Sequence, residues 1–199
     1  MSIDVLHSMA KFDNICNYIH LPVQTGSTRM LERMNRQHTR EEYMELVDNV
    51  KRIIPECAIS QDMITGFCGE TEEDHQDTLS LMEYVEYDFG FMFAYSERPG
   101  TLAAKKMEDD VPHEIKKRRL SEIINLQQRL SLAKMQQAVG KTVEILIEGD
   151  SKKSSEHWMG RNSQNAVAVF PKTDEKIGDL VMVRVDDCTS ATLIGTRVA

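Results

Sequence analysis

The sequence has no long hydrophobic run, no recognisable leader and few cysteines. No apolar segment approaches the roughly 18–20 residues that span a bilayer. The first eleven residues lack the basic start and apolar block of a secretory signal. We therefore expect a cytoplasmic protein with no membrane partner. The four cysteines are too far apart for a CxxC-type metal site, and disulfides are rare in the cytosol, so free thiols are predicted. They are Cys16, Cys57, Cys68 and Cys188.

The chain also lacks an excess of positive charge, since its formal net charge is −8. An acidic chain is a poor general nucleic-acid binder, so only local basic clusters are candidates for that role. One cluster is Lys116-Lys-Arg-Arg119, near the start of an expected helix. It either pairs with Glu114 and Glu122 or faces phosphate.

A strand–loop–helix pattern dominates the first two thirds of the chain. Short apolar runs are expected to form strands at Tyr18–Leu21, Ala58–Phe67 and Phe89–Tyr95. Each run ends in a polar, glycine-containing loop, and a helix-like stretch follows the first two. Parallel strands of this kind open all their loops on one face, which carries the chemistry in α/β barrels. The third run is apolar throughout, which predicts burial on both faces.

Helix signals separate these strands. Thr39-x-x-Glu42 and Thr71-x-x-Asp74 are typical of capped helix starts, and Ser27 or Thr28 is expected to cap a shorter helix. Apolar stripes at helical spacing predict the buried faces. They are Tyr43, Leu46, Val47, Val50 and Ile54; Thr78, Leu81, Met82 and Val85; and, in a long helix from 110 to 140, Ile115, Leu120, Ile123, Ile124, Leu130 and Ala133.

The pattern changes after Gly140. β-rich runs at 143–147, 166–170, 180–185 and 191–194 are separated by glycine- and proline-containing turns. Four or five short antiparallel strands in this length predict a small closed barrel. We therefore expect two domains, with residues 1–139 forming an α/β unit and residues 140–199 the barrel.

Polar residues lie in or just after the expected barrel-mouth loops: Gln24, Arg36, Asp62 and Tyr95. Asp62 stands within an otherwise apolar strand. A buried carboxylate without a partner costs several kcal/mol, so it must meet hydrogen-bond donors. Two alternatives stay open: Asp62 caps neighbouring backbone N–H groups, or it accepts hydrogen bonds from the hydroxyls of a ligand.

Four motifs follow one another along the chain: His20-Leu-Pro-Val-Gln-Thr-Gly-Ser27, Arg33-Met-Asn-Arg36, Asp62-Met-Ile-Thr-Gly-Phe-Cys-Gly-Glu-Thr71 and Tyr95-Ser-Glu-Arg-Pro-Gly-Thr-Leu-Ala-Ala104. In this order they resemble the radical S-adenosylmethionine methylthiotransferase family. The β-rich end, with Gly160-Arg161 and Gly178-Asp179, resembles the TRAM domain that binds RNA in that family. The resemblance implies a partial (β/α) radical SAM barrel followed by a small, all-β, OB-like antiparallel barrel.

The resemblance also implies how the cofactor S-adenosylmethionine is bound. Gln24 and Asp62 would contact its ribose, and Arg36 its carboxylate. Ile64 would pack on the adenine, and Tyr95 would border the substrate. Cys68 stands where the family usually has proline.

One part of the family pattern is absent from this sequence. Family members hold a [4Fe–4S] cluster with a CxxxCxxC motif, and a second cluster in an upstream domain. Neither motif is present here. The chain therefore resembles the second half of the radical barrel plus TRAM, and we expect it to be inactive alone.

The substrate implied by the resemblance is adenosine beside the tRNA anticodon. The favoured branch adds a methylthio group to C2 of N6-isopentenyladenosine. Sibling branches act on threonylcarbamoyladenosine or on a ribosomal-protein aspartate, and a non-catalytic RNA-binding protein is the alternative class. Oligomeric state is not fixed by the sequence, and a monomer is the expectation. Basic residues with an aromatic ring suit the anticodon stem-loop, although Trp158 could equally be buried. The candidates are Arg98, Lys152, Lys153, Trp158, Arg161, Lys172 and Arg197.

Overall fold

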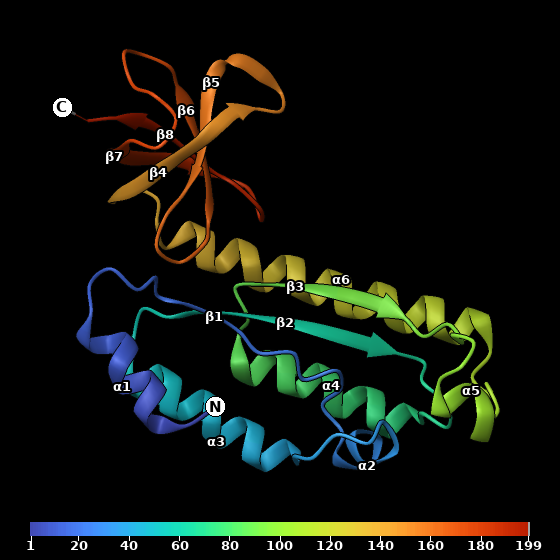
Figure 1. Cartoon of the computed structure of the whole chain (residues 1–199). Coiled ribbons are helices and arrows are strands. Elements are labelled where there is room, and N and C mark those ends of the chain that lie inside the picture. Colours follow the sequence, from blue (N-terminus) through green and yellow to red (C-terminus); the bar gives the residue numbers. More distant parts are fainter. Residues whose placement is uncertain (199) are drawn as a thin grey trace. The chain divides into compact units, whose positions relative to one another are not determined.

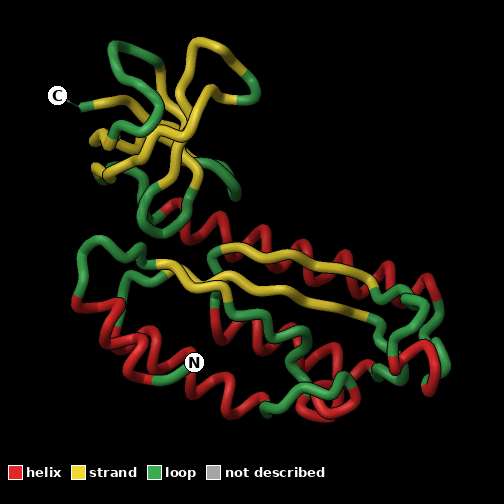
Figure 2. Tube along the Cα trace, in the orientation of Figure 1, coloured by secondary structure: helices red, strands yellow, loops and turns green. Residues whose placement is uncertain are grey.

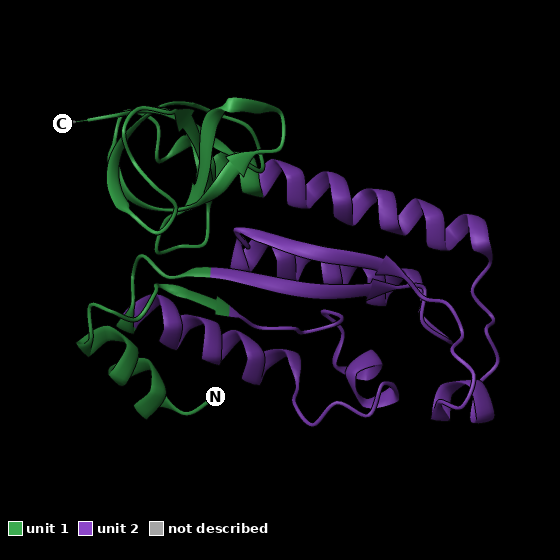
Figure 3. Ribbon diagram, turned by 45° about the horizontal axis from the view of Figure 1, so that its top comes forward, with its two compact units in different colours: residues 1–19, 53–58, 131–199 green, residues 20–52, 59–130 purple. Residues whose placement is uncertain are grey.

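The computed structural model describes residues 1–198 and divides the chain into two compact units (Figure 3). One unit combines Met1–Ile19, Ile53–Ala58 and Ser131–Ala199; the other combines His20–Arg52 and Ile59–Leu130. Each unit is described below by itself. The domain boundary near residue 140 stays a prediction.

A three-stranded sheet organises the α/β part, as the sequence predicts (Figures 1 and 2). Its strands are β1 (Tyr18–His20), β2 (Ala58–Thr65) and β3 (Phe89–Ala94), in the order β1-β2-β3. Strands β2 and β3 run parallel, in a register that pairs Asp62 with Phe91. Their carboxyl ends therefore lie at the same edge, where the loops predicted to carry function begin.

The helices begin where the capping signals predict. Thr39 and Glu42 bond each other's backbone N–H groups before α3, and Thr71 and Asp74 do so before α4. The Ser27 hydroxyl accepts a hydrogen bond from the first turn of α2. The helices are α1 (Ile3–Lys11), α2 (Thr28–Arg33), α3 (Arg40–Ile53), α4 (Glu72–Val85), α5 (Leu102–Lys106) and α6 (His113–Gln136).

The apolar stripes of α3 and α4 are buried as predicted, except that Leu46 is only half-buried. The stripe predicted for α6 is wrong in several places. Its residues Ile115, Leu120, Ile124 and Leu130 are half-buried, and Ala133 is exposed. The residues buried in its place include two cations and an amide, which a search for apolar spacing cannot find. Ile123 is buried as predicted, and the other buried residues of the helix include Lys116, Arg119, Leu126 and Gln127.

The prediction that β3 is buried on both faces is also wrong. Phe91 and Phe93 are 56% and 54% exposed, and they alternate with less exposed neighbours. On the opposite face Gly90 approaches Gln61 so closely that a side chain at Gly90 would collide with the Gln61 amide. The sheet therefore has one closely packed face and one open face.

The C-terminal strands form the closed barrel that the sequence predicts. They are β4 (Thr142–Ser151), β5 (Ser154–Arg161), β6 (Val167–Pro171), β7 (Leu180–Cys188) and β8 (Leu193–Arg197), joined in the order β4-β5-β6-β8-β7. The pairing is antiparallel except between β6 and β8, which run parallel. Along β7, buried and exposed residues alternate, so one side of the strand fills the barrel. The core comprises Ile145, Ile147, Ala168, Phe170, Val181, Val183, Val185 and Leu193.

Two glycines in this barrel predict opposite responses to substitution. A Cβ at Gly160 would collide with the Leu146 backbone carbonyl, whereas a Cβ at Gly149 would meet nothing within 4 Å. We expect Gly160→Ala to lower the free energy of unfolding by about 1–3 kcal/mol. Gly149→Ala should stay within about 0.5 kcal/mol. Denaturant unfolding followed by Trp158 fluorescence measures both, and equal effects would contradict the proposed close approach of β4 and β5.

Candidate functional site

The open face of the sheet carries the side chains predicted to bind a ligand. Asp62 and Ile64 are partly exposed, and their register partners on β3 are the exposed Phe91 and Phe93. Between them, Met63 points to the other face and is fully buried. A carboxylate, an aliphatic side chain and two aromatic rings therefore share one accessible surface.

Gln24 lies directly beside this surface. Its backbone N–H donates to the Asp62 carbonyl (2.9 Å), and its own carbonyl accepts from the Ile64 N–H (2.8 Å). The residue is 7% exposed and has a φ of 77°, in the left-handed region that non-glycine residues seldom adopt. Its side-chain amide has no hydrogen-bond partner among residues 1–198. The structure therefore brings together Gln24, Asp62 and Ile64, and leaves two polar groups available.

The surroundings of Asp62 bear on the two alternatives that the sequence left open. No backbone N–H within the described residues donates to its carboxylate, as a structural cap would require. The partner present is the His20 imidazole, with Nε2 3.5 Å from the carboxylate, and both side chains are about one-third exposed. This arrangement favours a carboxylate that accepts hydrogen bonds from a ligand.

The loop after β2 is held by a buried ion pair. The Glu70 carboxylate accepts from the Gly66 N–H (2.7 Å) and from the Arg119 guanidinium (2.8 Å), and both charged side chains are at most 5% exposed. Burial raises the pKa of Glu70, and the bonds from Gly66 and Arg119 oppose that rise. Gly66 itself has a φ of 74°, which favours glycine. Arg119 on α6 thus fixes the loop that the sequence associates with cofactor binding.

Tyr95 begins the loop that follows β3. Its N–H donates to the Thr65 carbonyl (2.8 Å), and its ring meets Phe67 edge-on, with the centroids 4.9 Å apart. The Lys116 ammonium lies 5.1 Å from the ring centroid and donates to the Tyr95 carbonyl (3.3 Å). Burial, followed by the contact with Cys68, raises the pKa of Tyr95 to about 12, so the phenol stays protonated at neutral pH.

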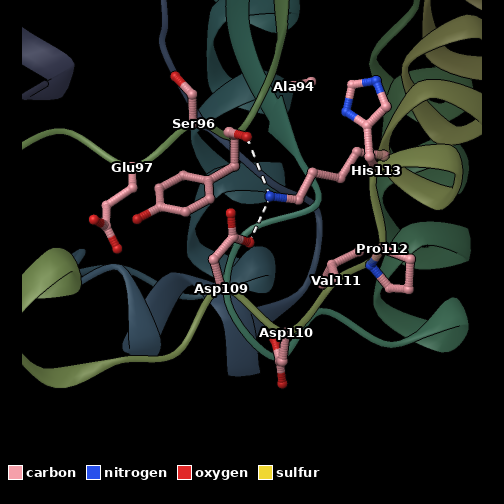
Figure 4. A pocket seen from close by; sticks show the side chains of 10 residues that line it. Ala94, Ser96, Glu97, Asp109, Asp110, Val111, Pro112 and His113 are labelled. Atoms are coloured by element: carbon pink, nitrogen blue, oxygen red, sulfur yellow. Dashed lines mark hydrogen bonds and ion pairs between the residues drawn. The ribbon is translucent and has the colours of Figure 1, made fainter.

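A cavity of about 620 Å³ lies beside Tyr95 (Figure 4). It is formed by the end of β3 and by the segment that leads into α6. Arg36, by contrast, is exposed beyond the end of α2. No bond within the described part of the chain joins its side chain to Gln24, Asp62 or Tyr95, so the structure does not gather all five predicted cofactor-binding residues.

The basic cluster at the start of α6 forms ion pairs within the chain. Arg118 pairs with Glu122, as one alternative predicts, and also with Glu72. The partner of Lys116 is Asp109, and the partners of Arg119 are Glu70 and Glu72; neither cation pairs with Glu114. These carboxylates are distant in sequence or lie in a loop, so no helical spacing identifies them. Because Lys116 and Arg119 are buried, the cluster is not an open phosphate-binding patch.

Several cations predicted to bind RNA have acidic partners in the barrel. Arg161 pairs with Glu148, Lys172 with Asp150 (2.7 Å) and Arg197 with Asp174 (2.7 Å). Arg98 is exposed in the loop after β3, and Lys152 and Lys153 are exposed at the tip of the β4–β5 hairpin.

Trp158 is half-buried against the barrel core. The Lys172 ammonium lies 4.2 Å from its ring centroid, and its indole N–H donates to Glu175 (3.1 Å). Its ring is therefore less open to stacking than a fully exposed aromatic would be.

Glu175 makes barrel stability depend on pH. Burial pushes the pKa of Glu175 up, but hydrogen bonds, chiefly from Thr173, outweigh it and lower the pKa to about 2 from a usual 4.5. A lowered carboxyl pKa adds stability above the unfolded value, and that stability is lost as pH falls. We expect the free energy of unfolding to drop between about pH 4.5 and 2, and to drop less in Glu175→Gln. Acid titration with Trp158 fluorescence tests this; superimposable curves would contradict it.

Within residues 1–198, no group of three or more His, Cys, Asp or Glu side chains is arranged to hold a metal ion. All four cysteines are free thiols, and Cys68 is fully buried. These residues do not fit a [4Fe–4S] cluster, so no step is assigned to one. In the same part of the chain, no helix is both long and apolar enough to cross a bilayer.

Comparison with known proteins defines the class. Residues 1–82 match the radical SAM superfamily, and residues 136–198 match the TRAM domain. The solved structure of coproporphyrinogen III oxidase from Escherichia coli, a radical SAM enzyme, superposes with a TM-score of 0.55 at 16% identity, covering 82% of this chain and 44% of that one. The fold is therefore that of a partial radical SAM barrel, as predicted, followed by a TRAM barrel.

Two relatives narrow the class further. Both are named tRNA-2-methylthio-N(6)-dimethylallyladenosine synthase. The protein from Christiangramia forsetii is 64% identical over 198 residues, covering 100% of this chain and 41% of the relative. That from Flavobacterium johnsoniae is 59% identical over 194 residues, covering 98% and 40%. The chain thus spans about two fifths of the length of the curated relatives it matches. It therefore carries radical SAM and TRAM sequences and is a high-identity homologue of proteins with this name.

Proposed function

We propose that this chain is part of a tRNA methylthiotransferase, in which it binds the nucleoside moiety of S-adenosylmethionine and helps to hold the tRNA. The substrate we propose is N6-dimethylallyladenosine, also called N6-isopentenyladenosine, next to the anticodon, and the methylthio group is added at C2. One observation carries the proposal: the Asp62 carboxylate, which among residues 1–198 meets only the partly exposed His20 imidazole, lies on an accessible sheet face beside Gln24, in a chain 64% identical to a relative with that name.

The open face fits a ribose and an adenine. The Asp62 carboxylate can accept two ribose hydroxyl hydrogen bonds, and the Gln24 amide can donate or accept one more. Ile64 offers an aliphatic surface for the adenine, and Phe91 and Phe93 extend that surface. We assign the S-adenosylmethionine carboxylate to Arg36, whose exposed guanidinium suits bidentate contact. When bound, the cofactor supplies methyl-transfer and one-electron chemistry that these side chains cannot supply.

The iron–sulfur clusters of the proposed enzyme require thiolates that the described residues do not assemble. This chain's own contribution is therefore binding and orientation. Gln24 and Asp62 hold the ribose beside β2, where the segment after β1 pairs with that strand. The Glu70–Arg119 pair keeps the loop after β2 in one conformation. Tyr95, neutral at physiological pH, borders the substrate side.

For the TRAM barrel we propose contact with the anticodon stem-loop, by a monomeric, cytoplasmic protein. Lys152 and Lys153 are exposed cations at a hairpin tip, where phosphate can approach from several directions. Arg161, Lys172 and Arg197 would exchange their acidic partners for phosphate on binding. Trp158 would stack on a base only if Lys172 moved from its ring. Arg98 lies outside the barrel and would meet phosphate near the target base.

A direct test uses the purified product of the complete gene, with reconstituted clusters, S-adenosylmethionine, a reductant and a sulfur source. The substrate is an anticodon stem-loop RNA that contains N6-dimethylallyladenosine. We expect mass spectrometry of the digested RNA to show one added methylthio group on that nucleoside. Modification of the threonylcarbamoyl nucleoside in a parallel RNA, with none on the dimethylallyl nucleoside, would replace this proposal with the sibling activity.

A further inference from the structure

The cavity beside Tyr95 has the size and lining of a ligand site. At about 620 Å³ it falls within the range of small-molecule pockets. It opens beyond the carboxyl end of β3, the edge at which barrels of this class place their chemistry. Its lining comes from two segments of one compact unit: Ala94, Tyr95, Ser96 and Glu97, and Asp109, Asp110, Val111, Pro112, His113 and Lys116.

The charge of the lining excludes phosphate as the natural occupant. Glu97, Asp109 and Asp110 contribute three carboxylates, against one ammonium from Lys116. That ammonium is already paired with Asp109. An excess of negative charge repels a phosphate and attracts N–H donors. In an RNA ligand, this favours a base edge over the backbone.

Glu97 and His113 are lining side chains without a hydrogen-bond partner among the described residues. Asp109 is bonded to Lys116, and Asp110 accepts from the Gly69 N–H (2.6 Å). Glu97 and His113, in contrast, make no side-chain hydrogen bond to any residue from 1 to 198, and both line the cavity (Figure 4). Ala94, Val111 and Pro112 are the apolar residues of the lining, and Figure 4 shows Val111 and Pro112 across the cavity from Glu97. The site thus combines a free acceptor with a surface for an alkyl group.

We propose that this cavity binds the N6-alkylated adenine of the tRNA, with Glu97 accepting the N6 hydrogen bond and the apolar residues of the lining receiving the alkyl substituent. Carboxylates accept well from exocyclic base N–H groups, and burying an alkyl chain is favourable in an apolar pocket. The inference rests on the proposed function and deepens it. It makes Glu97 a residue that distinguishes the alkylated base from other RNA.

Fluorescence anisotropy with the complete protein tests this assignment. The probes are two anticodon stem-loop RNAs that differ only in carrying N6-dimethylallyladenosine or adenosine at the target position. We expect the wild-type protein to prefer the alkylated RNA. Glu97→Ala should weaken binding of that RNA roughly tenfold, the loss of one hydrogen bond to a charged group. Glu114→Ala is the matched control, because Glu114 is exposed on the neighbouring helical turn but does not line the cavity.

A second variant fills the cavity without disturbing the core. Ser96 lines the cavity and is exposed, so Ser96→Trp should remove the preference for the alkylated RNA while leaving the affinity for the unmodified RNA unchanged. Thermal unfolding confirms that each variant is folded.

The outcomes distinguish failure of the cavity assignment from failure of the proposed function. A wild-type preference that survives in both variants overturns the cavity assignment alone. A wild-type protein without any preference overturns the assignment together with the proposed substrate. If Glu97→Ala weakens S-adenosylmethionine binding and leaves RNA binding unchanged, the cavity belongs to the cofactor and the assignment is wrong.

Discussion

Replacing Arg119 with alanine is expected to lower the free energy of unfolding by about 3–5 kcal/mol. The guanidinium is 5% exposed and pairs with the 1% exposed carboxylate of Glu70 at 2.8 Å. Removing one partner of a buried pair leaves the other charge without compensation, which is the costly case. Denaturant unfolding of the complete protein, monitored with a spectroscopic probe in the α/β part, measures the decrease in the free energy of unfolding.

Arg129 provides the matched control on the same helix. Its pair with Glu83 is 69% and 60% exposed, so Arg129→Ala should change the free energy of unfolding by less than about 1 kcal/mol. The double substitution Arg119→Ala with Glu70→Gln should recover part of the loss, because no buried charge then remains unpaired. An Arg119→Ala protein as stable as Arg129→Ala would contradict the conclusion that the Glu70–Arg119 pair fixes the loop after β2.

Replacing Asp62 with alanine is expected to weaken S-adenosylmethionine binding roughly 10- to 100-fold, without a matching loss of stability. The carboxylate is proposed to accept hydrogen bonds from ribose, and such bonds to a charged group are worth about 1.5–3 kcal/mol. Its contact with His20, at 3.5 Å on a partly exposed surface, contributes little to folding. Equilibrium dialysis with labelled cofactor measures the affinity.

Asp62→Asn keeps the size of the side chain and removes its charge, so its affinity should lie between wild type and alanine. Asp13→Ala changes an exposed carboxylate outside the sheet and should leave binding unchanged. Unchanged cofactor affinity in Asp62→Ala would show that the open sheet face is not the ribose site.

Local chemistry made much of the fold predictable. The capping pairs at Thr39 and Thr71, the apolar stripe of α4 and the four β-rich runs of the barrel depend on residues close in sequence, and each forms as predicted. Strand β5 has no counterpart among the predicted runs. The placement of Asp62 near Gln24 was predictable in part, since Gln24 follows one predicted strand and Asp62 lies within the next, and the pattern makes these strands parallel.

Long-range pairing limited the prediction elsewhere. Lys116 and Arg119 are charged residues that are nevertheless buried, because they form ion pairs with Asp109 and Glu70. No sequence spacing predicts these two pairs. The same applies to Trp158, whose cover by Lys172 depends on the β5–β6 pairing. The apolar run of β3 predicts burial on both faces, but Phe91 and Phe93 lie on an open face.

Nucleoside mass spectrometry of tRNA from cells that lack the complete gene tests the proposed activity most directly. We expect 2-methylthio-N6-dimethylallyladenosine to disappear and N6-dimethylallyladenosine to accumulate in these cells. The wild-type gene should restore the methylthio nucleoside, and the Asp62→Ala gene should restore much less. Unchanged levels of both nucleosides in the deletion strain would contradict the proposed activity, and loss of the methylthio-threonylcarbamoyl nucleoside would assign the protein to the sibling branch.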